Sequence, residues 1–176
     1  WSSDVCSSDL AFHLAESFYE LKLVEEGNSW AERVYALAPN SAVARKMRML
    51  AALSRDQKEE TLALALGIIE DRIDNRRAAF GDAVFTFSAL MILEGRAKEG
   101  FDYLVAQEPS IADFSVLAKG DHAGAMQGMA LPLKREFASH EEVMQDWQQT
   151  VTALDSSGIP WRRDRKSTRL NSSHLV

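Results

Sequence analysis

The segment that decides the fold is LAESFYELKLVEEGNSWAERVYALAPN, residues 14–40, which has the pattern of two short amphipathic helices. Apolar residues such as Leu14 and Phe18 recur every three to four positions, which places them on one face of a first helix. The Gly27-Asn28 pair predicts a break after this helix. A connection this short predicts two antiparallel helices that share an apolar face.

Local signals predict where the second helix of this segment begins and ends. Ser29 is followed three positions later by Glu32, a spacing that predicts a capping box in which each side chain binds a free backbone N–H group. Ala31 and Val34 supply the apolar face of this helix. Pro39 ends it, because proline has no N–H group for the next helical hydrogen bond.

The two ends of the chain differ from the rest in composition. Residues 1–10 (WSSDVCSSDL) and 164–174 (DRKSTRLNSSH) are rich in serine and have little apolar periodicity. One DNA strand can encode the first stretch while its reverse complement encodes the second, so both resemble a translated sequencing adapter. We therefore exclude residues 1–10 and 164–176 from the predicted domain, which spans residues 11–163.

This interpretation limits what the ends of the chain can indicate. Cys6 is the only cysteine and lies in the excluded stretch, so we expect no disulfide or thiolate chemistry in the domain. We also expect the domain to be a fragment of a longer protein. A missing signal peptide is then uninformative, and the compartment is unknown, with a cytoplasmic location slightly favoured.

The composition favours a helical domain with a mildly acidic surface. The 176-residue chain has only four prolines and nine glycines, and its formal net charge is −6. An acidic chain is a poor candidate for nucleic-acid binding through its overall field. We expect no membrane span, because the best apolar run, residues 78–93, is interrupted by Asp82.

The remaining sequence repeats the plan of a helical hairpin. Asp56 with Glu59 and Ser139 with Glu142 repeat the spacing of a capping box at the start of a second helix. Residues 110–119 are expected to be irregular or to form a short helix. The predicted hairpins span about residues 11–39, 41–73, 75–109 and 121–155.

Two of the later helices have distinctive patterns. Residues 76–94 form the most apolar predicted helix, with one face of Phe80, Val84, Phe87 and Met91 and a second of Phe85, Ala89 and Ile92. A helix that is apolar on two faces is expected in the middle of a stack. The last hairpin is expected to begin at a cap, Asp121, and to contain a bend at Pro132.

The hairpin over residues 14–40 resembles a tetratricopeptide repeat, a helix–turn–helix unit of about 34 residues. The residues that carry the resemblance are Leu14, Ala15, Phe18, Gly27, Ala31, Val34 and Pro39. The run GRAKEGFDYL at residues 95–104 resembles the turn and second helix of the same unit, and the resemblance is stronger over 14–109 than over 121–155. It implies an all-α, right-handed superhelix of about four hairpins. Another helical-repeat class, or an irregular helical domain, stays open.

No residue pattern predicts catalysis, a cofactor or a metal. His13, His122 and His140 are scattered, and none has a second histidine at metal-binding spacing. The acidic residues are spread over helix faces that are expected to meet water. Several methionines are expected to fill the core rather than to bind a cofactor, namely Met47, Met49, Met126, Met129 and Met144.

The candidate binding site is a basic cluster of Arg45, Lys46 and Arg48 on the third predicted helix and Arg55 in the turn after it. The resemblance implies a concave groove along the first helices of the hairpins, where peptides bind. Lys46 could occupy a place at which carboxylate-binding members of the family have a lysine, but Leu50 stands where they have an asparagine. The possible peptide-groove residues are Arg45, Lys46, Arg48, Asp82 and Thr86. The alternative is that the cluster pairs with Glu16 and Glu20 or meets water.

The sequence therefore predicts a non-catalytic scaffold that binds a protein or peptide partner of unknown identity, within a longer and possibly regulatory protein. One alternative is a helical accessory region of an enzyme whose catalytic domain lies elsewhere. Another is a small-molecule pocket, for which we expect a closed apolar cavity near Phe85, Phe87 and Trp147.

Overall fold

The computed structural model describes residues 3–72 and 77–158, and in these ranges it contains α-helices, one short 3-10 helix and no strand. The elements are α1 (Ser3–Glu20), α2 (Val24–Leu37), α3 (Ala42–Ser54), α4 (Lys58–Asp71), α5 (Arg77–Leu93), α6 (Ala97–Gln107), η1 (Pro109–Ala112), α7 (Asp121–Arg135) and α8 (His140–Ser156). The predicted all-α class is confirmed. The predicted end of the second hairpin at residue 73 and the predicted start of the third at residue 75 lie outside the described residues. The whole serine-rich C-terminal stretch, residues 164–174, lies outside them too.

The turn of the first hairpin falls at residues 21–23, earlier than the sequence predicts. Lys22 adopts a left-handed conformation there, with φ of 63°. The predicted break at Gly27-Asn28 lies inside α2, and so does the predicted capping box of Ser29 and Glu32; both predictions are wrong. A lysine gives no sequence signal for a left-handed turn, whereas the glycine gives a strong but misleading one.

Gly27 lies within α2 because the two helices of the hairpin approach closely at this point. A Cβ atom at Gly27 would lie 2.8 Å from two ring carbons of Tyr19, which is too close for any side chain. Glycine in a helix interior costs about 1 kcal/mol relative to alanine. The contact with the aromatic ring of Tyr19 on α1 explains why a glycine occupies this position.

The two later capping predictions have opposite outcomes. Asp56 has a left-handed φ of 56°, and α4 begins after Gln57 without a side-chain cap, so the predicted Asp56–Glu59 box is wrong. The Ser139–Glu142 box is confirmed at the start of α8. The Glu142 N–H donates to Ser139 Oγ at 3.3 Å, and the Ser139 N–H donates to Glu142 Oε2 at 2.9 Å.

Helices α3 and α7 begin at different kinds of cap. The Ser41 hydroxyl accepts from the Ala44 N–H at 3.1 Å and caps α3. At α7 the capping position belongs to Gly120, with φ of 95°, and Asp121 lies in the first turn, so the prediction that Asp121 is the cap is wrong. Pro132 lies inside α7, as the sequence predicts.

Buried residues of the first two hairpins recur at a fixed spacing of 34 residues. The matching pairs are Ala15 with Met49, Ala31 with Ala65, and Val34 with Ile68. All six side chains are at most 1% exposed. The spacing equals the length of the unit that the first hairpin resembles. The two hairpins therefore bury side chains at equivalent positions of one repeat plan.

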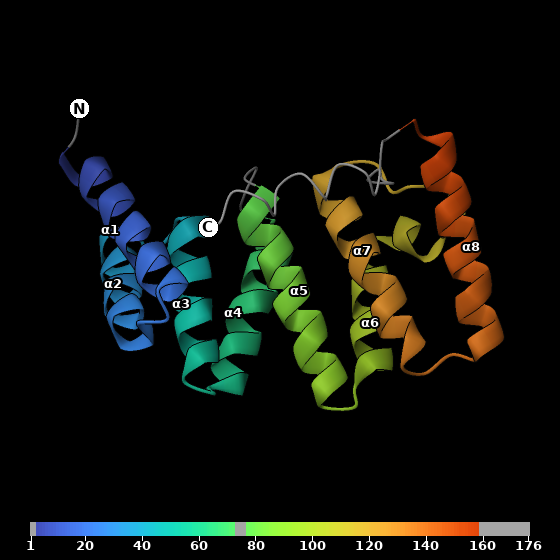
Figure 1. Cartoon of the computed structure of the whole chain (residues 1–176), viewed down its shortest axis with the longest axis horizontal. Coiled ribbons are helices and arrows are strands. Elements are labelled where there is room, and N and C mark those ends of the chain that lie inside the picture. Colours follow the sequence, from blue (N-terminus) through green and yellow to red (C-terminus); the bar gives the residue numbers. More distant parts are fainter. Residues whose placement is uncertain (1–2, 73–76, 159–176) are drawn as a thin grey trace, which may run out of the picture.

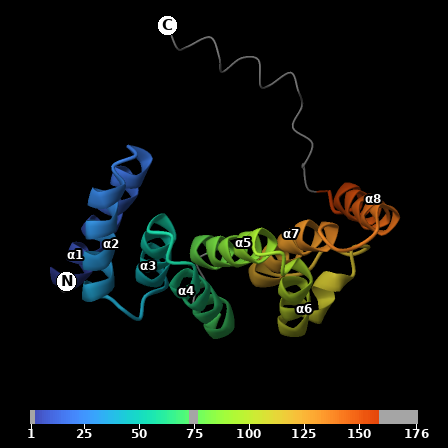
Figure 2. The same cartoon turned by 90° about the horizontal axis from the view of Figure 1, so that it is seen from below.

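The hairpins stack in a row from α1 at one end to α8 at the other (Figures 1 and 2). Helix α3 packs against α1 and α2, α5 packs against α3 and α4, and α7 packs against α5 and α6. Each odd-numbered helix after the first therefore lies against both helices of the preceding hairpin. This stacking, repeated along the chain, is the basis of an α-solenoid.

Helix α5 lies in the middle of the stack, as predicted, because it contacts helices of the hairpins on both sides. Its predicted first face is confirmed, since Phe80, Val84, Phe87 and Met91 are all buried. The prediction that its second apolar face is packed is wrong at one position, because the Phe85 side chain is 61% exposed.

The methionines fill the core with one exception. Met47, Met49 and Met126 are at most 1% exposed, and Met129 packs at the edge of the main apolar cluster. Met144 is 50% exposed, so it is not core filler. It belongs to α8, a helix with no buried residue, which leaves the last hairpin less closely packed than the others.

Candidate functional site

Each basic side chain of the predicted cluster forms an ion pair with an acid on another helix. The pairs and their shortest nitrogen–oxygen distances are Arg45–Asp71 at 2.6 Å, Lys46–Asp82 at 2.8 Å, Arg48–Glu60 at 3.0 Å and Arg55–Glu32 at 3.0 Å. These acids lie on α2, α4 and α5, which pack around α3. The predicted partners Glu16 and Glu20 are wrong, because the acids of those three helices are the ones within reach of α3.

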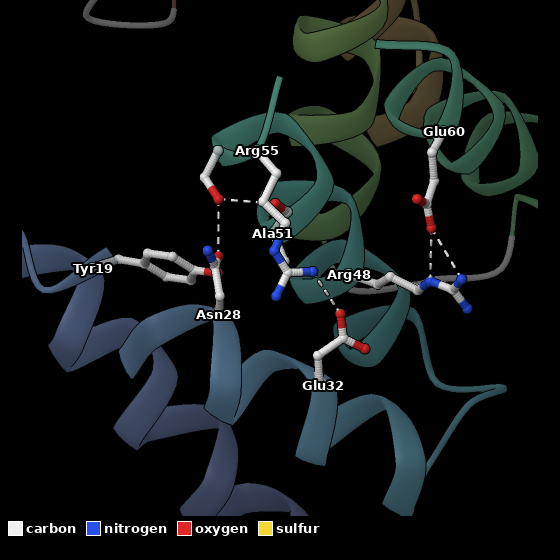
Figure 3. A network of polar contacts seen from close by, with 8 residues as sticks. Tyr19, Asn28, Glu32, Arg48, Ala51, Arg55 and Glu60 are labelled. Carbon is white, nitrogen blue, oxygen red and sulfur yellow. Dashed lines mark hydrogen bonds and ion pairs between the residues drawn. The ribbon is translucent and has the colours of Figure 1, made fainter. Parts of the chain in front are cut away.

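Arg48 makes the most extensive contacts of the four. Its Nε and a terminal nitrogen both donate to Glu60 Oε1, at 3.2 and 3.0 Å (Figure 3). Its guanidinium carbon lies 4.5 Å from the ring centre of Tyr35 on α2, a cation–π distance. The hydrogen bond with Glu60 raises the pKa of the Arg48 guanidinium. Arg48 therefore joins α2, α3 and α4, and stabilises the stack.

Two of the candidate groove residues, Lys46 and Asp82, contact each other across α3 and α5. The Lys46 side chain is only 13% exposed, whereas that of Asp82 is 48% exposed. Thr86, another candidate groove residue on α5, is buried at 5% exposure and is not available to a ligand from solvent. A carboxylate ligand could bind Lys46 only by competing with Asp82 for the ammonium group.

Exposed apolar side chains lie on the same faces as this ion pair. Leu53 is two helical turns beyond Lys46 on α3 and is 41% exposed, and Phe85 is one turn beyond Asp82 on α5. We refer to Lys46, Leu53, Asp82 and Phe85 as the α3–α5 surface. It combines a charge pair with uncovered apolar area, which is the mixture found in protein-binding surfaces.

A buried polar network that the sequence did not predict joins the first three helices (Figure 3). The Tyr19 hydroxyl donates to Asn28 Oδ1 at 2.9 Å, and the Ser54 hydroxyl lies 2.9 Å from the same oxygen. Asn28 is 1% exposed, and its Nδ2 has no hydrogen-bond partner among the described residues. Burial raises the pKa of Tyr19, an effect that nearby Arg55 opposes. The network fixes the register of α1, α2 and α3.

The three histidines within the described ranges lie apart from one another, and each has a different environment. His13 Nδ1 lies 3.8 Å from Glu16, the ring of His122 packs edge-on against Phe80 at 4.2 Å, and His140 begins α8. Within residues 3–72 and 77–158, no group of three or more histidine, cysteine or acidic side chains is placed to hold a metal ion. None of the described helices is long and apolar enough to cross a membrane.

An apolar groove of about 1130 Å³ lies between α7 and α8. Leu131 and Pro132 of α7 line one wall, and Val143 and Trp147 of α8 line the other. The Trp147 side chain is 50% exposed, so the groove is open to solvent. Its volume exceeds that of most small-molecule pockets.

The two walls of this groove are held together by a half-buried ion pair. Lys134 Nζ of α7 lies 2.6 Å from Asp146 Oδ2 of α8. The expected closed cavity near Phe85, Phe87 and Trp147 is wrong, because only Trp147 lines the groove. Phe87 is buried in the core, and Phe85 is exposed on the α3–α5 surface.

These features define an all-α, right-handed solenoid of tetratricopeptide-like hairpins. No family model matches the chain, and no curated protein matches it in sequence. Solved structures with a similar fold include those of MamA. The structure "MamA MSR-1 C2" has a TM-score of 0.54 at 17% identity, and it is matched over 89% of this chain and 82% of its own.

Two further MamA structures give the same result. "MamA AMB-1" is matched with a TM-score of 0.52 at 16% identity, over 97% of this chain and 82% of its own. A MamA point mutant is matched with a TM-score of 0.50 at 16% identity, over 87% of this chain and 81% of its own. The likeness confirms the predicted helical-repeat fold, and at these identities it concerns the fold alone.

Proposed function

We propose that this chain is a non-catalytic scaffold that binds a protein or peptide partner through the α3–α5 surface. The observation that carries the proposal is the exposure of Phe85, at 61%, beside the Lys46–Asp82 ion pair in the middle of the stack. A large aromatic side chain is seldom left uncovered, and aromatic residues dominate the energetics of protein interfaces. The helical-repeat fold supports the proposal, because stacked repeats present extended surfaces to partners.

The chemistry of the surface suggests what a partner would present. An apolar side chain of the partner would cover Phe85 and Leu53, whose exposed areas gain from leaving water. A carboxylate of the partner would compete with Asp82 for Lys46, which already lies 2.8 Å from that acid. Arg45, Arg48 and Arg55 serve this function indirectly, because their ion pairs hold α3 in place.

Peptide display tests the proposal directly. The immobilised 176-residue chain is used to select from a random peptide library, and the selected peptides are then titrated against variants by fluorescence anisotropy. We expect selected peptides to pair an acidic with an apolar residue. We expect Phe85→Ala and Lys46→Glu to weaken their binding at least tenfold.

A matched control comes from α6. Lys98 is 67% exposed and pairs with Asp102 on its own helix, away from the α3–α5 surface. Lys98→Glu therefore makes the same charge change as Lys46→Glu and should leave peptide affinity unchanged. If no peptide is selected, or if Phe85→Ala and Lys46→Glu both bind as well as the unmodified chain, this surface does not bind peptides.

A further inference from the structure

The exposed face of α5 carries an apolar stripe that continues beyond Phe85. Phe85, Ala89 and Ile92 recur at spacings of four and three residues, so they lie on one face of the helix. Phe85 is 61% exposed, and Ala89 and Ile92 are half-buried. The stripe begins one turn after Asp82 and therefore extends the α3–α5 surface towards the C-terminal end of α5.

The far end of this stripe reaches the apolar groove between α7 and α8, which we call the α7–α8 groove. Ile92 is one of the residues that line it, and α5 packs directly against α7. Ile92 lies two helical turns from Phe85, about 10 Å along the helix. The stripe thus joins the α3–α5 surface to the groove, and we refer to the two together as the apolar track.

The groove has a buried floor and an uncovered wall. Phe114, in the segment before α7, lines the groove and is only 3% exposed. Met144 and Trp147 of α8 line it as well, and each is 50% exposed. Helix α8 has no buried residue, so its own hairpin does not cover this wall. Exposed apolar area of this extent marks interaction sites, because its burial removes it from water.

The two parts of the track each carry a cation. Lys46 lies on the α3–α5 surface. In the groove, Arg135 is exposed and forms no ion pair with a described residue, whereas the adjacent Lys134 lies 2.6 Å from Asp146. Glu136 also lines the groove but does not pair with Arg135. An arginine binds a carboxylate through two parallel hydrogen bonds, so Arg135 suits an acidic side chain of a ligand.

We propose that one continuous segment of the protein partner occupies both parts of the track. An acidic and an apolar residue bind at Lys46 and Phe85, and a second acidic and apolar pair further along the same segment binds at Arg135 and Trp147. This inference rests on the proposed function and adds the pattern by which the partner is recognised. A small molecule in the groove would leave Phe85 uncovered, which is why a longer segment fits the track better.

The geometry sets the separation of the two pairs in the partner. The stripe on α5 accounts for about 10 Å, and the step from α5 to the groove adds one helix–helix spacing of about 8–10 Å. The total of about 20 Å corresponds to about six residues in an extended segment or about thirteen in a helix. The partner therefore carries two acidic–apolar pairs separated by a stretch of this length.

Selection from a library of peptides of about 20 residues, long enough to span the track in either form, tests the proposal. The immobilised 176-residue chain selects the peptides, and fluorescence anisotropy measures their affinity for variants. Trp147→Ala and Arg135→Glu should each weaken binding about tenfold, as should Phe85→Ala. Circular dichroism shows whether each variant is folded, and Arg135→Glu changes an exposed side chain without breaking an ion pair between described residues.

Shortened peptides assign each half of the segment to its part of the track. A peptide without the groove half should stay sensitive to Phe85→Ala and become insensitive to Trp147→Ala, and a peptide without the other half should show the reverse. The two half-peptides should bind the chain simultaneously. The intact peptide should bind more tightly than either half, because the second contact forms within the complex.

Two matched controls lie away from the groove. Leu37 on α2 is as exposed as Trp147, so Leu37→Ala truncates an apolar side chain of the same exposure. Lys98→Glu on α6 makes the same charge change as Arg135→Glu. Both control variants should bind the selected peptides as well as the unmodified chain does.

The outcomes separate this inference from the proposed function. Peptides that need Phe85 and Lys46 but bind Trp147→Ala and Arg135→Glu normally overturn the inference and leave the proposed function standing. Peptides that need Trp147 but bind Phe85→Ala and Lys46→Glu normally overturn both, because the α3–α5 surface then has no part in binding. A selection that yields no peptide also overturns both.

Discussion

Replacing Gly27 with alanine separates two explanations of this residue. If Gly27 marked a turn, its backbone conformation would matter; in the structure it lies inside α2, against the ring of Tyr19. The same substitution at Gly67, inside α4, provides the matched comparison, since a Cβ there would have no atom within 4 Å. We expect Gly67→Ala to stabilise the protein and Gly27→Ala to destabilise it relative to Gly67→Ala.

The magnitudes follow from helix propensity and from the contact distance. Gly67→Ala should raise the free energy of unfolding by about 1 kcal/mol. Gly27→Ala gains the same propensity but places a methyl group 2.8 Å from two Tyr19 carbons, and overpacking of this kind costs about 1–3 kcal/mol. The two variants should therefore differ by about 1–3 kcal/mol in unfolding free energy.

Urea denaturation followed by circular dichroism measures these free energies, and a double-mutant cycle identifies the cause. In a Tyr19→Ala background the clash is absent, so Gly27→Ala should now stabilise by about 1 kcal/mol. A penalty for Gly27→Ala that persists without the Tyr19 ring would refute the assigned contact. It would instead indicate a backbone conformation at Gly27 that only glycine tolerates.

Three further perturbations test other parts of the structure. Asn28→Ala leaves the Tyr19 and Ser54 hydroxyls without their shared acceptor, so it should lower the free energy of unfolding by about 1–3 kcal/mol. A variant as stable in urea as the unmodified chain would contradict the network. Burial raises the pKa of Tyr103 to about 12, so the neutral phenol stabilises the fold below pH 10, and the free energy of unfolding should fall as pH rises from 10 towards 12. Tyr103→Phe should remove this part of the alkaline loss of stability in urea titrations. An identical loss in both proteins would contradict the assignment. Hydrogen bonds from the Ser139 side chain and backbone lower the pKa of Glu142, so amide exchange in the first turn of α8 should accelerate as pH falls through that lowered pKa, after correction for intrinsic rates. Ser139→Ala removes the larger, side-chain contribution and should weaken this pH dependence; an unchanged pH dependence would contradict the capping box.

The sequence predicted the order of helices well, because apolar periodicity depends on burial and burial decides this fold. Phe80, Val84, Phe87 and Met91 were recognised as one face of α5, and all four are buried. Pro109 was recognised as the end of a helix, and α6 ends at Gln107. Such signals are local, so a single sequence carries them.

Turns and side-chain partners were harder to predict, because they depend on tertiary packing. Lys22 and Asp56 take left-handed conformations that their residue types do not announce, while Gly27 is required by a contact with Tyr19 on another helix. The four basic residues of α3 and its C-terminal cap are visible in the sequence, but their ion-pair partners are not. Arg45 reaches Asp71, 26 residues away, and no local pattern specifies that distance.

The α7–α8 groove was also beyond the sequence. The sequence predicts a possible cavity near Phe85, Phe87 and Trp147, but only Trp147 of these three lines the groove. The apolar stripe of α8 predicts that the helix packs on one face. It does not indicate how much of that face the neighbouring helix leaves uncovered, which depends on contacts such as Lys134–Asp146.

The central claim is that successive hairpins pack on one another, and nuclear Overhauser effects between aromatic rings test it most directly. The Phe80 ring of α5 lies 4.2 Å from the ring of His122 on α7, in the following hairpin. The account predicts a strong cross-peak between protons of these two rings in the folded chain. Spectra that resolve both rings and show no cross-peak between them would contradict the stacked arrangement.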